Sequence, residues 1–139
     1  MTTLEKLKDK GPNENKEGGK NMLYEVAQWR IYKKFSKRHG DMWQEILDEQ
    51  KAHSNKFYYT RSRILQSAEK EANPDEETWM WIDEYEDREA YDKMSKAVRK
   101  DPEVEKLKEK WHSEWDPMRI PGSMKAELWI ERAKVELKK

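Results

Sequence analysis

The chain has 139 residues, which is enough for one domain with a single hydrophobic core. Its 29 basic and 29 acidic residues balance, so no overall field attracts nucleic acid or an anionic membrane surface. The absence of cysteine excludes disulfides, thiolate nucleophiles and cysteine metal sites. No apolar run approaches the roughly 20 residues of a membrane span, and residues 1–20 lack the apolar core of a secretory signal. We therefore expect no membrane partner and, by default, a cytoplasmic location.

The core must be built largely from aromatic side chains. Charged residues make up 42% of the chain and aliphatic residues are few, but there are seven Trp and six Tyr. Each of these rings can bury up to about 250 Å². Packed aromatic rings must therefore supply the buried apolar area that Ile and Val supply in an ordinary core.

The first half of the chain predicts a tail, a strand, a helix and a second strand. Residues 1–20 are rich in glycine and scattered charges, and we expect a mobile tail before a single domain at residues 21–139. Alternating apolar side chains over residues 22–33 predict the first strand. Ser36 is expected to cap a helix that continues to about His53. Residues 57–65 then predict the second strand, followed by a hairpin turn at residues 68–77.

The stretch from Thr78 to Asp87 organises the second half. Both of its alternating faces are apolar, which predicts a central strand that needs cover on both sides. Asp87 can cap a second helix, which restarts at Asp101-Pro102 and ends at Asp116-Pro117. A fourth strand is expected from about Ser123 to Leu137.

The order strand, helix, strand, strand, helix, strand predicts an α+β fold of ferredoxin-like topology. Right-handed crossovers give a four-stranded antiparallel sheet with both helices on one face. The other face has no helix to cover it, and soluble monomers avoid large exposed apolar patches. We therefore expect a homodimer in which two sheets pack face to face as an α/β barrel.

Three stretches resemble the dimeric α/β-barrel superfamily, most closely its NIPSNAP-like and antibiotic-biosynthesis-monooxygenase-like branches. They are the opening Met22-Leu23-Tyr24-Glu25, the strand-to-helix stretch at residues 82–90, and the helix restart Asp101-Pro102-Glu103-Val104. The resemblance covers roughly residues 22–137. It rests on the order of the elements more than on a specific sequence motif. It implies a homodimer with a pocket beside each sheet, and cofactor-independent monooxygenase activity in some members.

Haem degradation, which the resemblance attaches to one branch, is not supported by the residues. That branch uses an Asn on the first strand, a Trp at the end of the third and a His on the second helix. Tyr85 stands where the Trp would be, the first strand offers Gln28, and the second helix has no His before His112. None of the three positions matches, so we expect no cofactor.

Asp83 and His112 are the candidate catalytic residues. A carboxylate that faces the interior beside tryptophan can have a raised pKa and act as a base. Capping or pairing with an arginine is the plainer account of Asp83, as it is of Glu25 and Glu84. His112 is a candidate general base or metal ligand, and the plainer account is a residue favoured by the dipole at the end of a helix. The three histidines are too far apart for a local metal motif, and no metal site is expected.

A set of aromatic residues and one arginine is the candidate ligand pocket. Arg61 and Arg63 share a strand face, with Tyr59 beside them by alternation, and such a pair suits an anionic planar ligand or a dimer contact. Aromatic core packing is the alternative explanation for the tryptophans. The expected lining residues are Trp29, Tyr59, Arg61, Trp79, Trp81, Tyr85 and Trp129.

Two functions stay open from the sequence. The first is a monooxygenase-like enzyme, or a binder, acting on a hydrophobic or aromatic small molecule in an aromatic-lined pocket. The second is a non-catalytic homodimeric assembly module. RNA binding is disfavoured, because acidic residues at positions 75–77 and 83 flank the third strand and repel phosphate.

Overall fold

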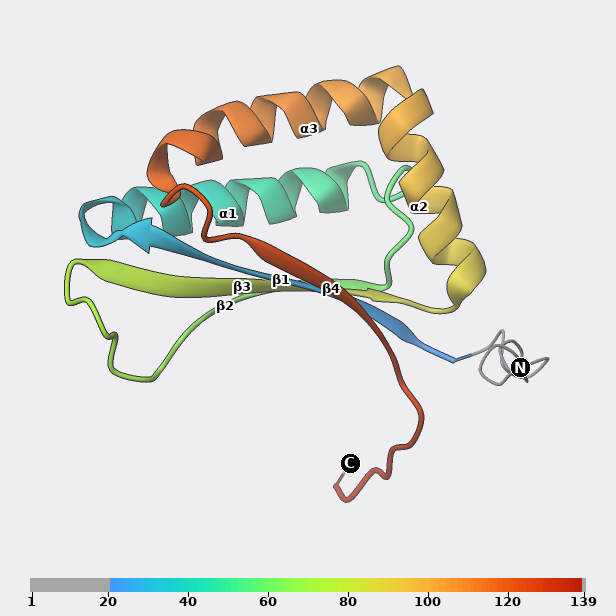
Figure 1. Ribbon diagram of the computed structural model, residues 1–139. Coiled ribbons are helices and arrows are strands. Elements are labelled where there is room, and N and C mark those ends of the chain that lie inside the picture. The colour runs from blue at the N-terminus through green and yellow to red at the C-terminus, as the bar shows by residue number, and fades with distance from the viewer. Residues whose placement is uncertain (1–20, 139) are drawn as a thin grey trace.

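The computed structural model describes residues 21–138 (Figure 1), so the expected tail at residues 1–20 lies outside the described residues. Along these described residues, four strands and three helices follow one another, with a short 3-10 turn after β1 and another after α3. The elements are β1 (Leu23–Tyr32), η2 (Lys33–Phe35), α1 (Ser36–Ala52), β2 (Arg61–Gln66), β3 (Glu76–Tyr85), α2 (Arg88–Lys100), α3 (Pro102–Trp115), η3 (Asp116–Met118) and β4 (Lys125–Ile130).

The four strands form one antiparallel sheet in the order β2-β3-β1-β4. The two long strands, β1 and β3, pair in the middle over ten residues each, from Leu23 opposite Tyr85 to Tyr32 opposite Glu76. The predicted ferredoxin-like α+β fold is therefore confirmed. The doubly apolar strand β3 lies in the interior of the sheet, as its sequence indicates.

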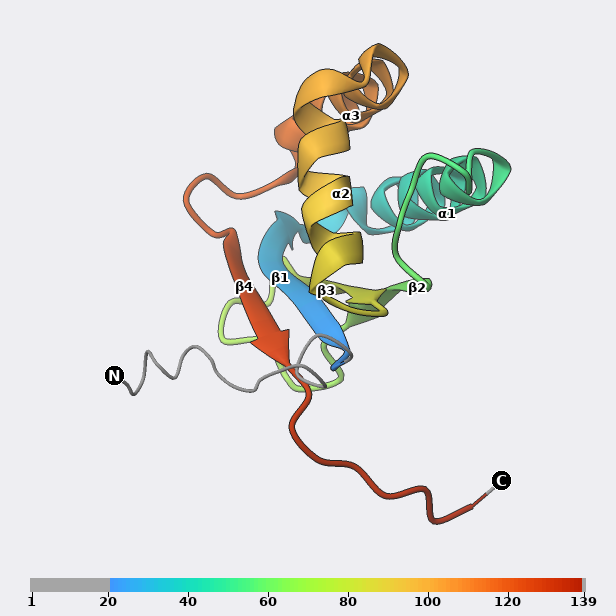
Figure 2. The ribbon, with the colours of Figure 1, turned by 90° about the vertical axis from the view of Figure 1, so that its right-hand side faces the viewer.

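All three helices lie on the same side of the sheet (Figures 1 and 2). The helix α1 runs along the sheet, α2 rises steeply from the end of β3, and α3 turns back beside α1. The sequence predicts one restarted second helix, whereas the structure has two, α2 and α3, which meet at Asp101. The change of direction at this residue lets α3 reach back over the middle of the sheet.

The helix-facing side of the sheet holds the core. Strand alternation turns Ala27 and Trp29 of β1 toward the helices, and the register places Trp81 and Trp79 of β3 opposite them. Trp29 is fully buried and packs edge-on against Trp115 of α3, with ring centroids 4.8 Å apart. Trp43 of α1 lies against the same rings. The expected aromatic core is thus present as one indole cluster, comprising Trp29, Trp43, Trp81 and Trp115.

Two of the three predicted helix caps are present. Asp87 accepts a hydrogen bond from the Ala90 N–H at 2.9 Å, and Asp101 accepts from the N–H groups of Glu103 and Val104. The prediction for Ser36 is wrong: Ser36 is the first residue of α1, and Phe35 precedes it with no side-chain cap. The 3-10 turn η2 leads directly into α1, so the chain enters this helix already coiled.

Two strands are shorter than predicted. Residues 57–60 precede β2 as irregular chain, and β2 begins only at Arg61. Tyr59 consequently leaves the alternation of β2 and packs against Tyr85 on the helix side, at 5.5 Å between ring centroids. The expected grouping of Tyr59 with the two arginines is therefore wrong. β4 ends at Ile130 because its partner β1 begins at Leu23, directly opposite.

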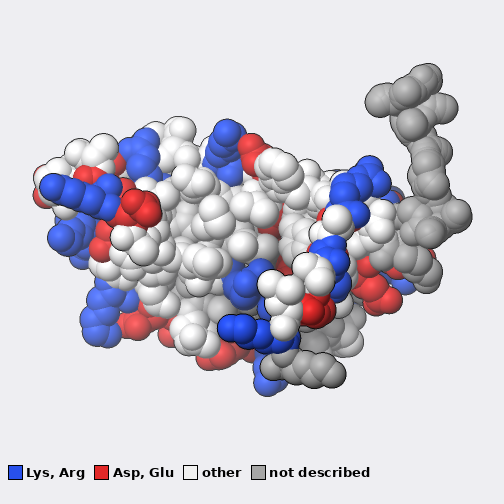
Figure 3. Space-filling view, turned by 90° about the horizontal axis from the view of Figure 1, so that it is seen from below, with Lys and Arg blue, Asp and Glu red and all other residues white. Residues whose placement is uncertain are grey.

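The second face of the sheet, called the open face below, carries no helix. Strand alternation places Val26, Met80 and Ile82 at its centre. Leu65 and Trp129 are exposed on the same face, and Glu84 pairs with Arg63 at 2.9 Å. Figure 3 looks onto this side and shows uncharged side chains in the middle, with most of the charged ones around them.

Candidate functional site

Three polar side chains form a row across the helix-facing side of the sheet. The register aligns Glu25 of β1, Asp83 of β3 and Ser62 of β2. Side chains at directly opposite positions have Cβ atoms about 5 Å apart, so the two carboxyl groups are close neighbours. The row is bounded on one side by Ala27 and Trp81 and on the other by Tyr85. A pair of acids therefore lies within an otherwise aromatic surface.

Asp83 is the most strongly perturbed acid of this row. Its side chain is buried, with 7% of the residue exposed. The Ser62 hydroxyl donates a hydrogen bond of 2.6 Å to Asp83 Oδ1. Burial raises the pKa of Asp83 from 3.8 to about 6, and Glu25 adds to this, while the Ser62 hydrogen bond and the Lys108 charge oppose it. Asp83 can therefore both take up and release a proton near neutral pH.

The helix α3 places two basic side chains over the acidic row. Val104, Lys108, Trp111 and Trp115 share one stripe of α3 at helical spacing. Lys108 thus points inward and is half-buried, while His112 is exposed at the rim. Burial lowers the pKa of the Lys108 ammonium, with Asp83 and Glu25 opposing the shift, and burial also lowers the pKa of His112.

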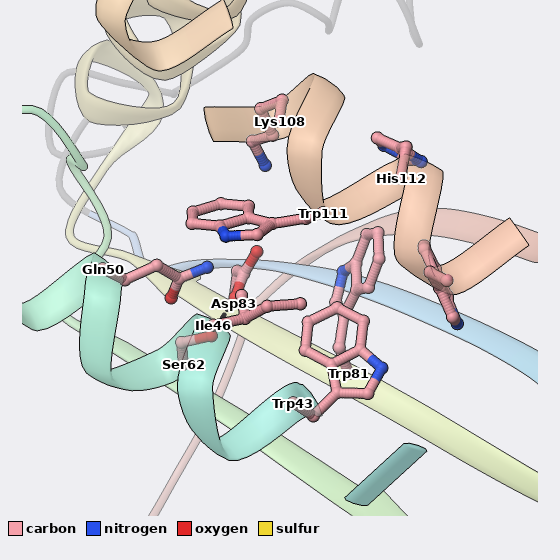
Figure 4. Close-up of a pocket in the computed structure, with 10 residues that line it drawn as sticks. Trp43, Ile46, Gln50, Ser62, Trp81, Asp83, Lys108, Trp111 and His112 are labelled. Atoms are coloured by element: carbon pink, nitrogen blue, oxygen red, sulfur yellow. Dashed lines mark hydrogen bonds between the residues drawn. The ribbon is translucent and has the colours of Figure 1, made fainter. Parts of the chain in front are cut away.

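These residues enclose a cleft with a deep end, and Figure 4 shows the side chains that line this deep end. The open part has a volume of about 570 Å³ and lies between the sheet and the helices α2 and α3. The deep part has a volume of about 40 Å³ and lies between α1, α3 and the sheet. Trp81, Asp83, Lys108 and His112 line both parts. We call this space the Asp83 cleft.

Aromatic rings surround the Asp83 cleft, and two of their buried polar groups have no hydrogen-bond partner in the described part of the chain. The Tyr85 hydroxyl donates to Glu25 Oε1 at 3.3 Å. The Tyr59 hydroxyl and the Trp81 Nε1–H are buried and have no hydrogen-bond partner among residues 21–138. A buried unpaired donor costs about 1–3 kcal/mol.

The structure brings five of the nine predicted site residues to this cleft. They are Tyr59, Trp81, Asp83, Tyr85 and His112. The remaining four lie elsewhere. Trp29 and Trp79 are packed in the core, Arg61 is on the open face near Glu84 at 3.6 Å, and Trp129 is 58% exposed on the open face. Sequence alone could not separate Trp29 and Trp79 from Trp81, because alternation puts all three on one face of the sheet and does not show which ring borders a cavity.

Lys108 is the site residue that the prediction missed, together with Ser62. Lys108 lies four residues after Val104 and seven before Trp115, so it falls on the apolar stripe of α3. A lysine at a stripe position is the available signal. Ser62 carries no such signal in the sequence, because a serine in a strand does not indicate a functional site until its cross-strand partner is known.

Within residues 21–138, no group of three or more His, Asp or Glu side chains is arranged to hold a metal ion. None of the helices described there is long and apolar enough to cross a membrane.

Comparison with known proteins identifies the fold only. No family model and no curated protein matches the sequence. Among solved structures, a provisionally assigned antibiotic biosynthesis monooxygenase from Caulobacter crescentus CB15 has a TM-score of 0.59 at 10% identity, over 83% of this chain and 93% of that one.

Two further structures are similar at the same level. A dimeric ferredoxin-like protein from an uncultured marine organism has a TM-score of 0.57 at 12% identity, over 86% of this chain and 94% of that one. A conserved protein from Methanosarcina mazei Go1 has a TM-score of 0.53 at 9% identity, over 82% and 96%. The NIPSNAP-like likeness stays a prediction. The chain therefore has the ferredoxin-like fold found in antibiotic-biosynthesis-monooxygenase-like and dimeric proteins.

Proposed function

We propose that the protein binds an aromatic or other hydrophobic small molecule in the Asp83 cleft and acts on it as a monooxygenase-like enzyme without a metal or a tightly held organic cofactor. The observation that carries the proposal is Asp83 itself. It is a buried carboxyl group with a pKa near 6, in an aromatic-walled cleft, beside the cation Lys108. A proton acceptor poised near neutral pH is what general-base catalysis requires.

The chemistry starts with proton transfer. The Asp83 carboxylate takes a proton from an acidic O–H of a bound phenol, and the net charge of the cleft does not change. The electron-rich phenolate then reacts with dioxygen as the oxidant. One oxygen atom replaces a ring hydrogen as a new carbonyl, and the other leaves as water, so that a phenol plus dioxygen gives a quinone plus water. The rings of Tyr59 and Trp81, which line the cleft, support this proposal as apolar surfaces against which the ring of the phenol can pack.

The test uses naphthol as the probe, with binding followed by calorimetry and oxygen uptake by an electrode. Wild-type protein is expected to bind naphthol and to consume oxygen. Asp83→Asn is expected to keep binding and lose at least about 100-fold in rate, the usual contribution of a general base. The matched control is Asp48→Asn, an exposed acid of α1 that lies outside the cleft, which should keep both. Equal rates in the two variants would remove Asp83 from the mechanism.

We also propose that the protein is a homodimer joined through its open faces. The apolar centre formed by Val26, Met80 and Ile82 needs cover, and the charges around it balance rather than repel. One solved structure of the same fold is described as dimeric, which supports the proposal.

A non-catalytic assembly module is the second candidate. The observation in its favour is the small volume of the deep cavity, about 40 Å³, because the indole cluster fills most of the helix side. A thermal-shift screen with quinones, aromatic acids, fatty acids and haem separates the two candidates. Stabilisation by an aromatic compound favours the enzyme or binder, and no stabilisation by any compound favours the module.

A further inference from the structure

Lys108 stands apart from the other lysines of α3. Lys106 and Lys110 are exposed, and Lys110 pairs with Glu49 at 3.1 Å. Lys108 is half-buried, lines both parts of the Asp83 cleft and makes no ion pair within 4.0 Å among residues 21–138. In Figure 4 its amino group points down from α3 into the cleft. An amine in this position is directed at whatever the cleft holds.

The charges that line the cleft select against an anionic ligand. Its acids are Glu25, Asp83, Glu105 and Glu109, and its bases are Arg99, Lys108 and His112. An uncharged ligand therefore enters more readily than a carboxylate or a phosphate. A cation formed inside the cleft is stabilised by the same acids and by the faces of the aromatic rings.

We propose that Lys108 forms a covalent imine with an uncharged aldehyde or ketone that carries an aromatic or apolar body. The inference uses the cleft of the proposed function but not its oxygen chemistry. An amine held in apolar surroundings is the usual nucleophile for carbonyl compounds. Desolvation also lowers the pKa of Lys108, which increases the fraction of neutral amine.

The step balances with Asp83 as the acid. The neutral Lys108 Nζ attacks the carbonyl carbon, and a proton moves from nitrogen to oxygen to give a carbinolamine. Protonated Asp83 then delivers its proton to that hydroxyl, which leaves as water while the nitrogen lone pair forms the C=N bond. The products are an iminium cation, one water molecule and the Asp83 carboxylate. Asp83 and Glu25, aligned across β3 and β1, then lie beside the new positive charge.

Reductive trapping tests the proposal on the full chain. Wild-type protein is treated with benzaldehyde and cyanoborohydride at pH 7, and modified lysines are located by peptide mass mapping over time. Lys108 is expected to gain a benzyl group severalfold faster than Lys106 or Lys110, because its lowered pKa leaves more of its amine neutral at pH 7. Its rate should also rise less than theirs between pH 7 and pH 9. Equal rates at the three lysines would overturn the proposal.

Two variants sharpen the result. Asp83→Asn removes the acid that expels water, so trapping at Lys108 should slow even though the loss of the Asp83 charge leaves more of the Lys108 amine neutral. Trapping at Lys106 should be unaffected by this variant, and Lys106→Arg should leave Lys108 labelling unchanged. Naphthol binding, measured in parallel, separates this inference from the proposed function. Naphthol binding without selective trapping overturns the imine alone. Selective trapping at Lys108 without naphthol binding supports the imine and overturns the proposed function.

Discussion

Asp83 is held on the inner side of the sheet by the alternation of β3, between Trp81 and Tyr85. The fold raises its pKa from 3.8 to about 6, so the folded protein holds this proton more tightly than the unfolded chain does. Its stabilising contribution is therefore complete below about pH 4 and is lost as the pH rises through 6. A rise of about two pH units in pKa corresponds to about 3 kcal/mol.

The variant Asp83→Asn tests whether the stabilisation contributed by Asp83 decreases as the pH rises. The asparagine cannot ionise, so the free energy of unfolding of the variant, relative to wild type, should increase by up to about 3 kcal/mol between pH 4 and pH 7. Urea unfolding at a series of pH values measures it. The control is Asp48→Asn, an exposed acid of α1. A difference that stays constant with pH would contradict the assignment of Asp83.

His39 gives the opposite pH dependence. It is fully buried in the core, where its Nε2 accepts a hydrogen bond from Trp29 Nε1 at 3.0 Å. Burial lowers its pKa from 6.5 to about 4. The unfolded chain binds this proton more tightly, so the stabilisation is complete above about pH 6.5 and disappears as the pH falls through 4.

The prediction for His39 is that its ring stays neutral from pH 8 to pH 5. Nuclear magnetic resonance of the imidazole Cε1–H should show no titration in that range. His39→Gln, which can still accept from Trp29, should make the stability fall less steeply between pH 6 and pH 4. A ring midpoint near 6.5 would show that the core admits water or charge at His39.

Among the elements, those that the sequence predicts well are the ones with strong local signals. The alternation of β1 and β3 gives their faces, and Asp87 and Asp101 mark helix starts by their side-chain chemistry. The ends of β2 and β4 differ from the prediction because a strand ends where its hydrogen-bonded partner ends. That partner lies far away in the sequence, so local sequence does not show where pairing stops. The sequence predicts one restarted helix where the structure has two, because nothing local fixes the angle at Asp101.

The candidate site was predictable in part for the same reason. Asp83 and Tyr85 follow from alternation once β3 is recognised. Lys108 was missed because a lysine is usually solvated, and only the packing of α3 over the sheet shows that its stripe position is inward. The sequence predicts Trp129 in the pocket because it does not tell which face of β4 meets the helices.

The cap at Asp101 has a measurable energetic role. Its Oδ1 accepts from two N–H groups at the start of α3, and its other oxygen pairs with Lys56 at 2.8 Å. Asp101→Ala should therefore lower the free energy of unfolding by about 1–2 kcal/mol. Asp92→Ala, on the exposed side of α2, removes the same charge without a cap and should cost under about 0.5 kcal/mol. Equal losses in denaturant unfolding would argue against the cap.

At the scale of the whole molecule, the open face is the surface through which we propose that two chains join. A stable interface buries about 800 Å² on each partner, which a four-stranded sheet face can supply. Ile82 lies at the centre of that face, on the middle strand β3. A second sheet packed there would remove its apolar side chains from water.

Ile82→Asp should convert the dimer to a monomer, because a buried unpaired carboxylate at the centre of the interface is costly. Light scattering after size-exclusion chromatography gives the mass. The control is Lys96→Glu, an exposed change on α2 that should stay dimeric. A wild-type protein that is monomeric at high concentration would contradict the interface itself.

The distribution of the seven tryptophans also gives the protein a built-in optical reporter. Trp129 is 58% exposed, whereas Trp29, Trp43, Trp79, Trp111 and Trp115 are each at most 9% exposed. The red edge of the intrinsic emission therefore comes mainly from Trp129. If two chains join, this red edge should shift to the blue as the protein concentration rises, and the shift should be absent in Trp129→Phe. Dimer formation could then be measured without any added label.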